Sequence, residues 1–153
     1  MKPKLLVSAC LLGTPCRYDG KSKKNEAVCA LAERFELIPV CPEVLGGLPT
    51  PRTPSERRGA CVVRKDGRDV TAEYRRGAEC ALETAQREGV LAAVLKERSP
   101  SCGSGEIYDG TFTGALTAGD GVTAELLKAN GITVYGEGGQ GLTEFLCSVS
   151  HST

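Results

Sequence analysis

The sequence lacks the residues that mark several common classes of protein. Its single histidine, His151, lies near the C-terminus, and none of its cysteines forms a Cys-x-x-Cys motif, so no zinc finger is indicated. Neither sign of charge is in excess, because 19 basic residues balance 19 acidic residues. We therefore expect no nucleic-acid partner and no anionic membrane partner.

Two further absences limit the ligands and the location. No Gly-x-Gly-x-x-Gly motif follows the first predicted strand, which disfavours a nucleotide site of the Rossmann type. The apolar stretch within residues 1–16 is too short for a membrane-spanning helix. We therefore expect a cytoplasmic protein with a small-molecule partner, and the sequence leaves the oligomeric state open.

What the sequence has in abundance is cysteine, with eight in 153 residues. A chain of this length with 41% hydrophobic residues can bury a core without disulfides. In a reducing compartment such cysteines pack as small hydrophobic residues, bind a metal or react. The positions are Cys10, Cys16, Cys29, Cys41, Cys61, Cys80, Cys102 and Cys147.

Apolar runs and amphipathic segments alternate along the chain. The predicted strands are residues 4–10, 36–41, 90–95 and 132–137, and the predicted helices are residues 25–35, 71–89, 119–131 and 140–147. Such alternation predicts a Rossmann-like α/β fold, with a mainly parallel sheet of about four strands flanked by helices. We expect a single domain over residues 1–147 and a flexible C-terminal tail over residues 148–153.

Two local signals refine this prediction. Residues 60–64 and 68–71 flank Lys65, Asp66 and Gly67, which predicts a small β-hairpin insertion. Thr71 is a candidate N-cap of the long helix that follows, and Gly89 is its candidate stop.

Three cysteines follow predicted strands. Cys10 ends the first strand, Cys41 ends the second and Cys102 lies in the loop after the third, while Cys16 lies on the first loop. Because ligands of parallel α/β sheets bind outside the carboxyl ends of the strands, we expect these cysteines to converge. The other four lie in predicted helices or in the hairpin, where we expect packing roles: Cys29, Cys61, Cys80 and Cys147.

The chemistry of three converging thiolates leaves several possibilities open. Thiolates suit zinc, copper(I) or iron–sulfur clusters, and three of them leave one coordination position unfilled. An open position is unusual for structural zinc, whereas a 4Fe-4S cluster would keep one iron free for substrate. The alternatives are buried packing cysteines, a thiol-exchange protein using Cys10 with Cys16 or Cys41, and a non-catalytic zinc or cluster-binding module.

Three motifs occur in order at these loops: VSACLLGTPCRYDG, VCPEVLGGLPTPR and LKERSPSCGSGEIYDGTF. Together they resemble the thiouracil desulfidase family, formerly a domain-of-unknown-function family. The resemblance implies a 4Fe-4S cluster held by Cys10, Cys41 and Cys102 with one open iron. It also implies an enzyme that removes sulfur from a thiouracil-type substrate, and we hypothesise a non-redox hydrolysis that releases sulfide.

The same resemblance points to residues around the cluster. Glu43 and Ser99 are candidate catalytic residues for proton transfer or for positioning water, although Glu43 could be a surface charge and Ser99 a turn residue. Candidate substrate contacts are Cys16, Arg17, Asp19 and Ser101. Cys16 could also be a fourth ligand, and it could equally be a sulfur-handling thiol or a packing residue. Each polar candidate could be part of a surface loop.

Overall fold

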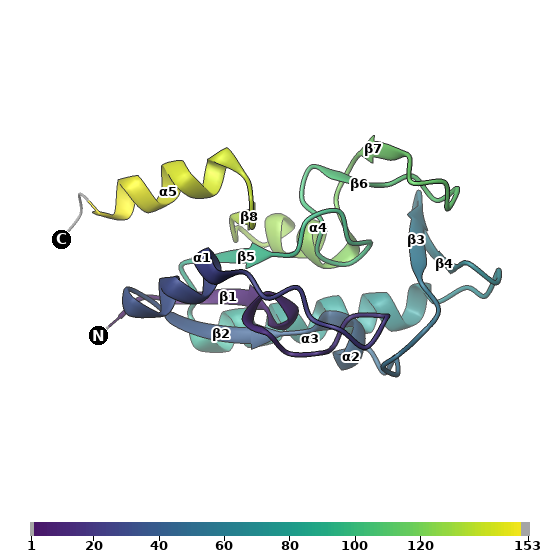
Figure 1. Cartoon of the computed structure of the whole chain (residues 1–153), viewed down its shortest axis with the longest axis horizontal. Helices are drawn as coiled ribbons and strands as arrows, with labels where there is room; N and C mark the ends of the chain where they lie inside the picture. Colours follow the sequence, from purple (N-terminus) through teal and green to yellow (C-terminus); the bar gives the residue numbers. More distant parts are fainter. Residues whose placement is uncertain (1, 151–153) are drawn as a thin grey trace.

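The computed structural model describes residues 2–150, which fold around a four-stranded parallel sheet (Figure 1). The strand order is β2-β1-β5-β8, and every neighbouring pair is parallel. The strands span β1 Lys4–Ser8, β2 Glu36–Val40, β5 Ala92–Leu95 and β8 Val134–Gly136. The predicted α/β fold with a mainly parallel sheet is therefore confirmed.

Helices cover both faces of the sheet, and the side chains of β1 point alternately to the two layers. Leu5 and Val7 pack towards α1 (Glu26–Cys29) and α5 (Gln140–Ser150). Leu6 packs on the other face, towards α3 (Thr71–Glu88) and α4 (Val122–Ala129). Since successive residues of a strand point to opposite faces, this short apolar run supplies the core of both layers.

Several helix boundaries differ from the sequence-based prediction. The segment 25–35 forms only one α-turn, α1, followed by a 3-10 turn, η2, over Ala30–Glu33. Thr71 is the first residue of α3 rather than its N-cap, whereas Gly89 ends this helix in a left-handed conformation, with φ of 64°. The last helix, α5, extends three residues into the segment that we expected to be a tail, and His151 lies outside the described residues.

A short helix, α2 (Pro42–Leu45), follows β2 directly and packs against α3 through two glycines. A Cβ atom at Gly77 would collide with the carbonyl oxygen of Pro42, and one at Gly46 would collide with that of Glu73. The backbones of α2 and α3 thus approach more closely than any larger residue would permit.

Two antiparallel hairpins lie beyond the sheet. The predicted hairpin has a different partner strand, because β4 (Cys61–Arg64) pairs with β3 (Ser55–Arg58), while residues 68–71 contribute only a bridge from Asp69 to Val63. The second hairpin, β6 (Glu106–Tyr108) with β7 (Leu116–Ala118), was not predicted. Figure 1 shows the two hairpins next to each other at one end of the molecule.

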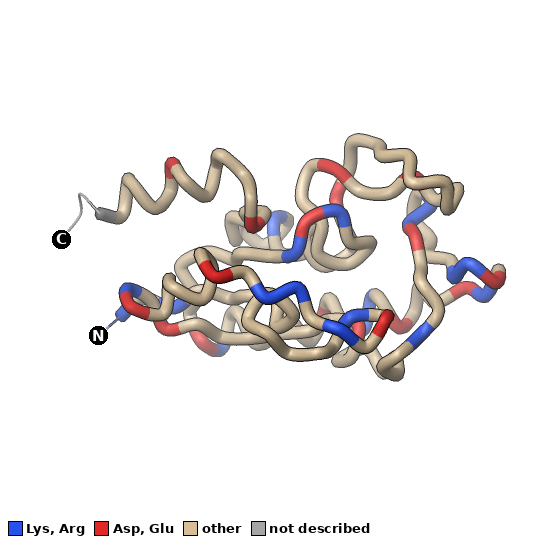
Figure 2. Tube along the Cα trace, in the orientation of Figure 1, with Lys and Arg blue, Asp and Glu red and all other residues tan. Residues whose placement is uncertain are grey.

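The surface charges follow the balance of the composition. Figure 2 shows basic and acidic residues interspersed along the trace of the chain. Over the described residues, no helix combines the length and the apolar character needed to cross a bilayer.

Candidate active site

The loops at the carboxyl ends of β1, β2 and β5 enclose a cavity of about 580 Å³. The first loop begins with a 3-10 turn, η1 (Ala9–Leu12), which carries Cys10. Cys41 follows β2 at once, and Cys102 lies in the loop that leaves β5. All three line this cavity together with Cys16, so the predicted convergence is observed.

Cys16, Cys41 and Cys102 are in an environment that favours their protonated form. Burial raises the pKa of Cys102 to about 12. The pKa of Cys41 is also raised, by a hydrogen bond with Cys16 and by burial, and the Cys41 thiol donates to the Cys16 carbonyl oxygen at 3.8 Å. A hydrogen bond with Cys10 raises the pKa of Cys16. Cys16 therefore lies within reach of both Cys10 and Cys41.

The thiols that line the cavity suit a metal or metal cluster, which binds thiolates and supplies positive charge. A bound metal deprotonates a coordinating thiol, which offsets the cost of burying the thiolate. No three Cys, His, Asp or Glu side chains among the described residues converge closely enough for a single metal ion. A cubane cluster binds each thiolate through a different iron, so its ligands must surround a cavity instead of a point. The cavity, which four cysteines line, fits an iron–sulfur cluster.

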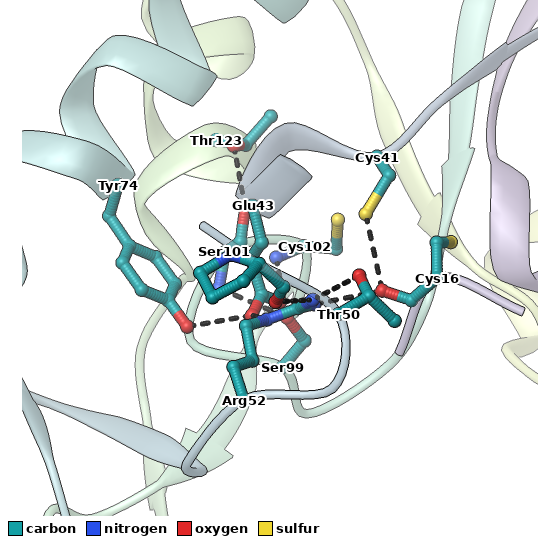
Figure 3. Close-up of polar contacts among 11 residues, drawn as sticks. Cys16, Cys41, Glu43, Thr50, Arg52, Tyr74, Ser99, Ser101, Cys102 and Thr123 are labelled. Atoms are coloured by element: carbon teal, nitrogen blue, oxygen red, sulfur yellow. Dashed lines mark hydrogen bonds and ion pairs between the residues drawn. The ribbon is translucent and has the colours of Figure 1, made fainter. Parts of the chain in front are cut away.

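Glu43 lies on α2, two residues after Cys41, and lines the same cavity. Its Oε1 atom accepts a hydrogen bond from the Tyr74 hydroxyl at 2.8 Å and one from Arg52 Nε at 3.1 Å. Figure 3 shows both donors directed at this carboxylate. Glu43 is thus a held carboxylate in the cavity wall rather than a free surface charge, with 17% of its side chain exposed.

Arg52 joins three segments of the wall although only 6% of its side chain is exposed. Besides Glu43, its guanidinium donates to the Cys16 carbonyl oxygen at 2.9 Å and to Pro49 and Thr50. The loop that carries Cys16 is therefore fixed to the start of α2.

Ser99 lines the cavity and also organises the loop of Cys102. Its hydroxyl oxygen accepts hydrogen bonds from the backbone N–H groups of Ser101 and Cys102, both at 3.0 Å. This is the turn-capping geometry that the alternative interpretation of Ser99, as a turn residue, predicts. The same hydroxyl retains its own hydrogen for donation.

Two of the four expected substrate contacts do not line the cavity. Ser101 is fully buried, and its hydroxyl pairs with that of Thr123 at 2.8 Å. Asp19 forms an ion pair with Arg17 at 3.5 Å and accepts the N–H of Lys21, so it stabilises the first loop. Arg17 does line the cavity, as does Cys16.

The prediction that the remaining four cysteines pack in the interior is wrong for two of them. Cys61 and Cys147 are exposed, because Cys61 lies on a hairpin and Cys147 lies on the outer side of α5. Cys29 and Cys80 are half-buried in α1 and α3, and the Cys29 thiol donates to the Leu11 carbonyl oxygen at 3.7 Å.

Some residues of the wall were not indicated by the sequence. Tyr74 belongs to an apolar stripe of α3 with Ala78 and Ala81, which predicts burial but not the partner of its hydroxyl. Lys96 follows β5, lines the cavity and pairs with Glu137 at 3.1 Å. Tyr108 reaches the cavity from the unpredicted hairpin.

The chain resembles known proteins over nearly its whole length. Residues 5–138 match the family described as 2-thiouracil desulfurase. The uncharacterized protein YbbK of Bacillus subtilis (strain 168) is 44% identical over 143 residues, which cover 87% of this chain and 95% of YbbK. The solved structure of a 4Fe-4S-dependent thiouracil desulfidase, TudS (DUF523Vcz), is 50% identical with a TM-score of 0.89, covering 97% of this chain and 99% of that one.

Proposed function

The chain belongs to the 2-thiouracil desulfurase family, and from this premise we propose that it is a 4Fe-4S-dependent desulfidase acting on a thiouracil-type small molecule. The observation that carries the proposal is the cavity in which Cys10, Cys41 and Cys102 meet beside Glu43 and Ser99. These three cysteines would hold the cluster as thiolates. The solved structure at 50% identity, described as 4Fe-4S-dependent, supports the same cofactor here.

A cluster held by three thiolates would leave one iron without a protein ligand and would supply Lewis-acid chemistry for the sulfur of a thiocarbonyl. The net reaction that we propose is a hydrolysis, in which water replaces the sulfur on carbon and the sulfur leaves as sulfide. Carbon keeps its oxidation level, so the reaction consumes no oxidant and no reductant.

Glu43 has the position expected of the residue that moves a proton in this reaction. Its carboxylate belongs to the cavity wall close to Cys41, and Tyr74 and Arg52 both donate to its Oε1 atom. A fixed carboxylate can accept a proton from attacking water and return it to the product. Ser99 would orient water or substrate with its hydroxyl hydrogen, since its oxygen is already occupied by two N–H groups.

Arg17 and Cys16 remain the residues of the first loop that we propose as substrate contacts, because both line the cavity. The eight free cysteines fit a reducing compartment, so we propose that the protein acts in the cytoplasm.

The proposal is tested first on the cofactor, using protein reconstituted anaerobically with iron and sulfide. We expect about four irons and four sulfides per chain, with absorption in the visible range. Cys10→Ala, Cys41→Ala and Cys102→Ala should each lose the cluster. Cys80→Ala, which removes a half-buried thiol of α3 outside the cavity, is the matched control and should retain it.

The second arm measures sulfide and uracil formed from 2-thiouracil. The wild-type and Cys80→Ala proteins should release one sulfide for each uracil, whereas Glu43→Gln should retain the cluster and react about 100-fold more slowly. Wild-type protein that takes up no iron, or that binds a cluster yet releases no sulfide from any thiocarbonyl base, would contradict the proposed function.

A further inference from the structure

Ser8, the last residue of β1, is a polar residue in the interior, with 3% of its surface exposed. The backbone pairing of β1 with β5 ends at Val7 and Val94. Beyond that point the Ser8 hydroxyl oxygen accepts the N–H of Lys96 at 2.9 Å. The Ser8 side chain therefore supplies the next hydrogen bond between the two central strands after their backbone pairing ends. Ser8 lines the cavity at this point.

Since the Ser8 oxygen is the acceptor in this bond, its own hydrogen needs another acceptor. A buried hydroxyl without one would be destabilising. Cys102 lines the same cavity as Ser8, and the side-chain interaction of Ser8 with the Cys102 thiol favours the thiolate. Ser101 also reaches this sulfur, and it can donate there only when Thr123 supplies the hydrogen of their mutual bond at 2.8 Å. The oxygen of Ser8 already accepts the N–H of Lys96, so the Ser8 hydrogen is available to Cys102.

Among the three proposed cluster ligands, Cys102 has most need of such a donor. It is 5% exposed, compared with 8% for Cys10, while Cys41 is only partly buried. A thiolate loses most of its hydration at a site of this kind, so a hydrogen bond from the protein has to replace water.

We propose that Ser8 is a positioning residue for the cofactor: it donates its hydroxyl hydrogen to the Cys102 sulfur when that sulfur ligates the cluster. This inference rests on the proposed function, because it assumes the cluster on Cys10, Cys41 and Cys102. A hydrogen bond to a ligand sulfur withdraws negative charge from the cluster, which stabilises the reduced form and strengthens the hold on iron.

The test compares two variants of nearly equal shape, Ser8→Thr, which keeps the hydroxyl, and Ser8→Val, which lacks it. Ser8→Ala is a third, smaller variant in case Val is not accommodated. Ser104→Ala is the matched control, because it removes a hydroxyl from the loop of Cys102 that has no hydrogen bond among the described residues. Each full-length protein is reconstituted anaerobically, and two quantities are measured: the midpoint potential of the cluster and the rate at which a chelator removes iron.

We expect a more negative potential for Ser8→Val and Ser8→Ala than for the wild type, Ser8→Thr and Ser104→Ala. Iron should leave the two variants without the hydroxyl about 10-fold faster, the lower end of the range for loss of an outer-shell partner. If Ser8 had only a structural role, its substitution would change folding, but the midpoint potential of the cluster would not depend on the presence of the hydroxyl.

If all variants share one potential and one rate of iron loss, the Ser8 inference is wrong while the proposed function stands. If Ser8→Thr behaves as Ser8→Val does, the hydroxyl is not the active element and the inference again fails. A wild-type protein that binds no cluster overturns the inference together with the proposed function.

Discussion

A single hydroxyl, that of Tyr74, links the long helix α3 to the carboxylate of Glu43. Tyr74 is 2% exposed, and its pKa is raised above the ordinary value by burial and by the negative charge of Glu43. The phenol therefore remains protonated and keeps donating to the carboxylate.

We predict that Tyr74→Phe lowers the free energy of unfolding by about 1.5–3 kcal/mol, the usual value of a hydrogen bond to a charged group. The ring stays in place, so the loss reports the hydroxyl alone. Urea unfolding of the cluster-free protein measures it. Tyr135→Phe, a half-buried tyrosine packed against Phe145, is the control and should change stability by less than about 0.5 kcal/mol.

The difference in stability between the wild type and Tyr74→Phe should depend on pH. Since the folded-state pKa of Tyr74 lies above the unfolded-state value of about 10, its contribution to stability is fully present below pH 10. It is lost as the pH rises above that value. The stability difference between wild type and Tyr74→Phe should thus be constant from about pH 7 to 9 and decrease above 10. A stability difference between the two proteins that increases above pH 10 would contradict this prediction.

At the scale of elements, the contact between α2 and α3 determines where Cys41 and Glu43 lie. These residues stand at the start of α2, which Gly46 and Gly77 allow to approach the backbone of α3. No side chain separates the two helices at this point. The position of Cys41, a proposed cluster ligand, thus depends on a glycine in a helix far along the chain.

We predict that Gly77→Ala destabilises the protein by about 1–3 kcal/mol through overpacking, although alanine favours a helix by about 1 kcal/mol over glycine. The reconstituted variant should also hold less iron, because α2 must move away with Cys41. Urea unfolding and iron content are the two measurements. In the control, Gly141→Ala in α5, the new methyl group would lie 3.3 Å from the Tyr135 ring and would meet no backbone atom, so the loss of stability should be smaller than for Gly77→Ala and the iron content should not change.

At the scale of the molecule, the two hairpins complete the cavity that the sheet loops begin. Glu56 on β3 accepts the N–H groups of Gly110 and Phe112 at 2.9 and 3.1 Å, which ties the loop between β6 and β7 to the other hairpin. Arg58 donates to the Gly110 carbonyl oxygen at 2.6 Å. Glu56 and Tyr108 both line the cavity, so this junction belongs to its wall.

We predict that Glu56→Ala loosens the second hairpin while the central sheet keeps its stability. Amide hydrogen exchange over residues 106–118 should become about 10-fold faster or more, the loss of roughly 1.4 kcal/mol or more of local stability, and exchange in β1 and β5 should not change. Substrate KM should rise with little change in iron content. Glu83→Ala, an exposed residue of α3, is the control. Equal exchange in both variants would refute this role of Glu56.

The sequence by itself determined the parallel sheet and the three loops where Cys10, Cys41 and Cys102 meet. These features depend on local patterns: apolar runs of strand length, Gly and Pro at strand ends, and the rule that parallel strands share one carboxyl edge. The motifs around the cysteines are equally local, and they indicate the family from the sequence alone.

Only the tertiary structure decided which side chains complete the site. It buried Ser101 against Thr123, joined Glu43 to Tyr74 and Arg52, and placed the Ser8 hydroxyl between Lys96 and Cys102. It also paired β4 with β3 and formed the hairpin of β6 and β7. Each of these contacts joins polar groups that are distant in sequence or short strands with weak patterns. Their partners are selected by the packed backbone, because a buried polar group must find an acceptor or donor wherever the fold brings one within reach.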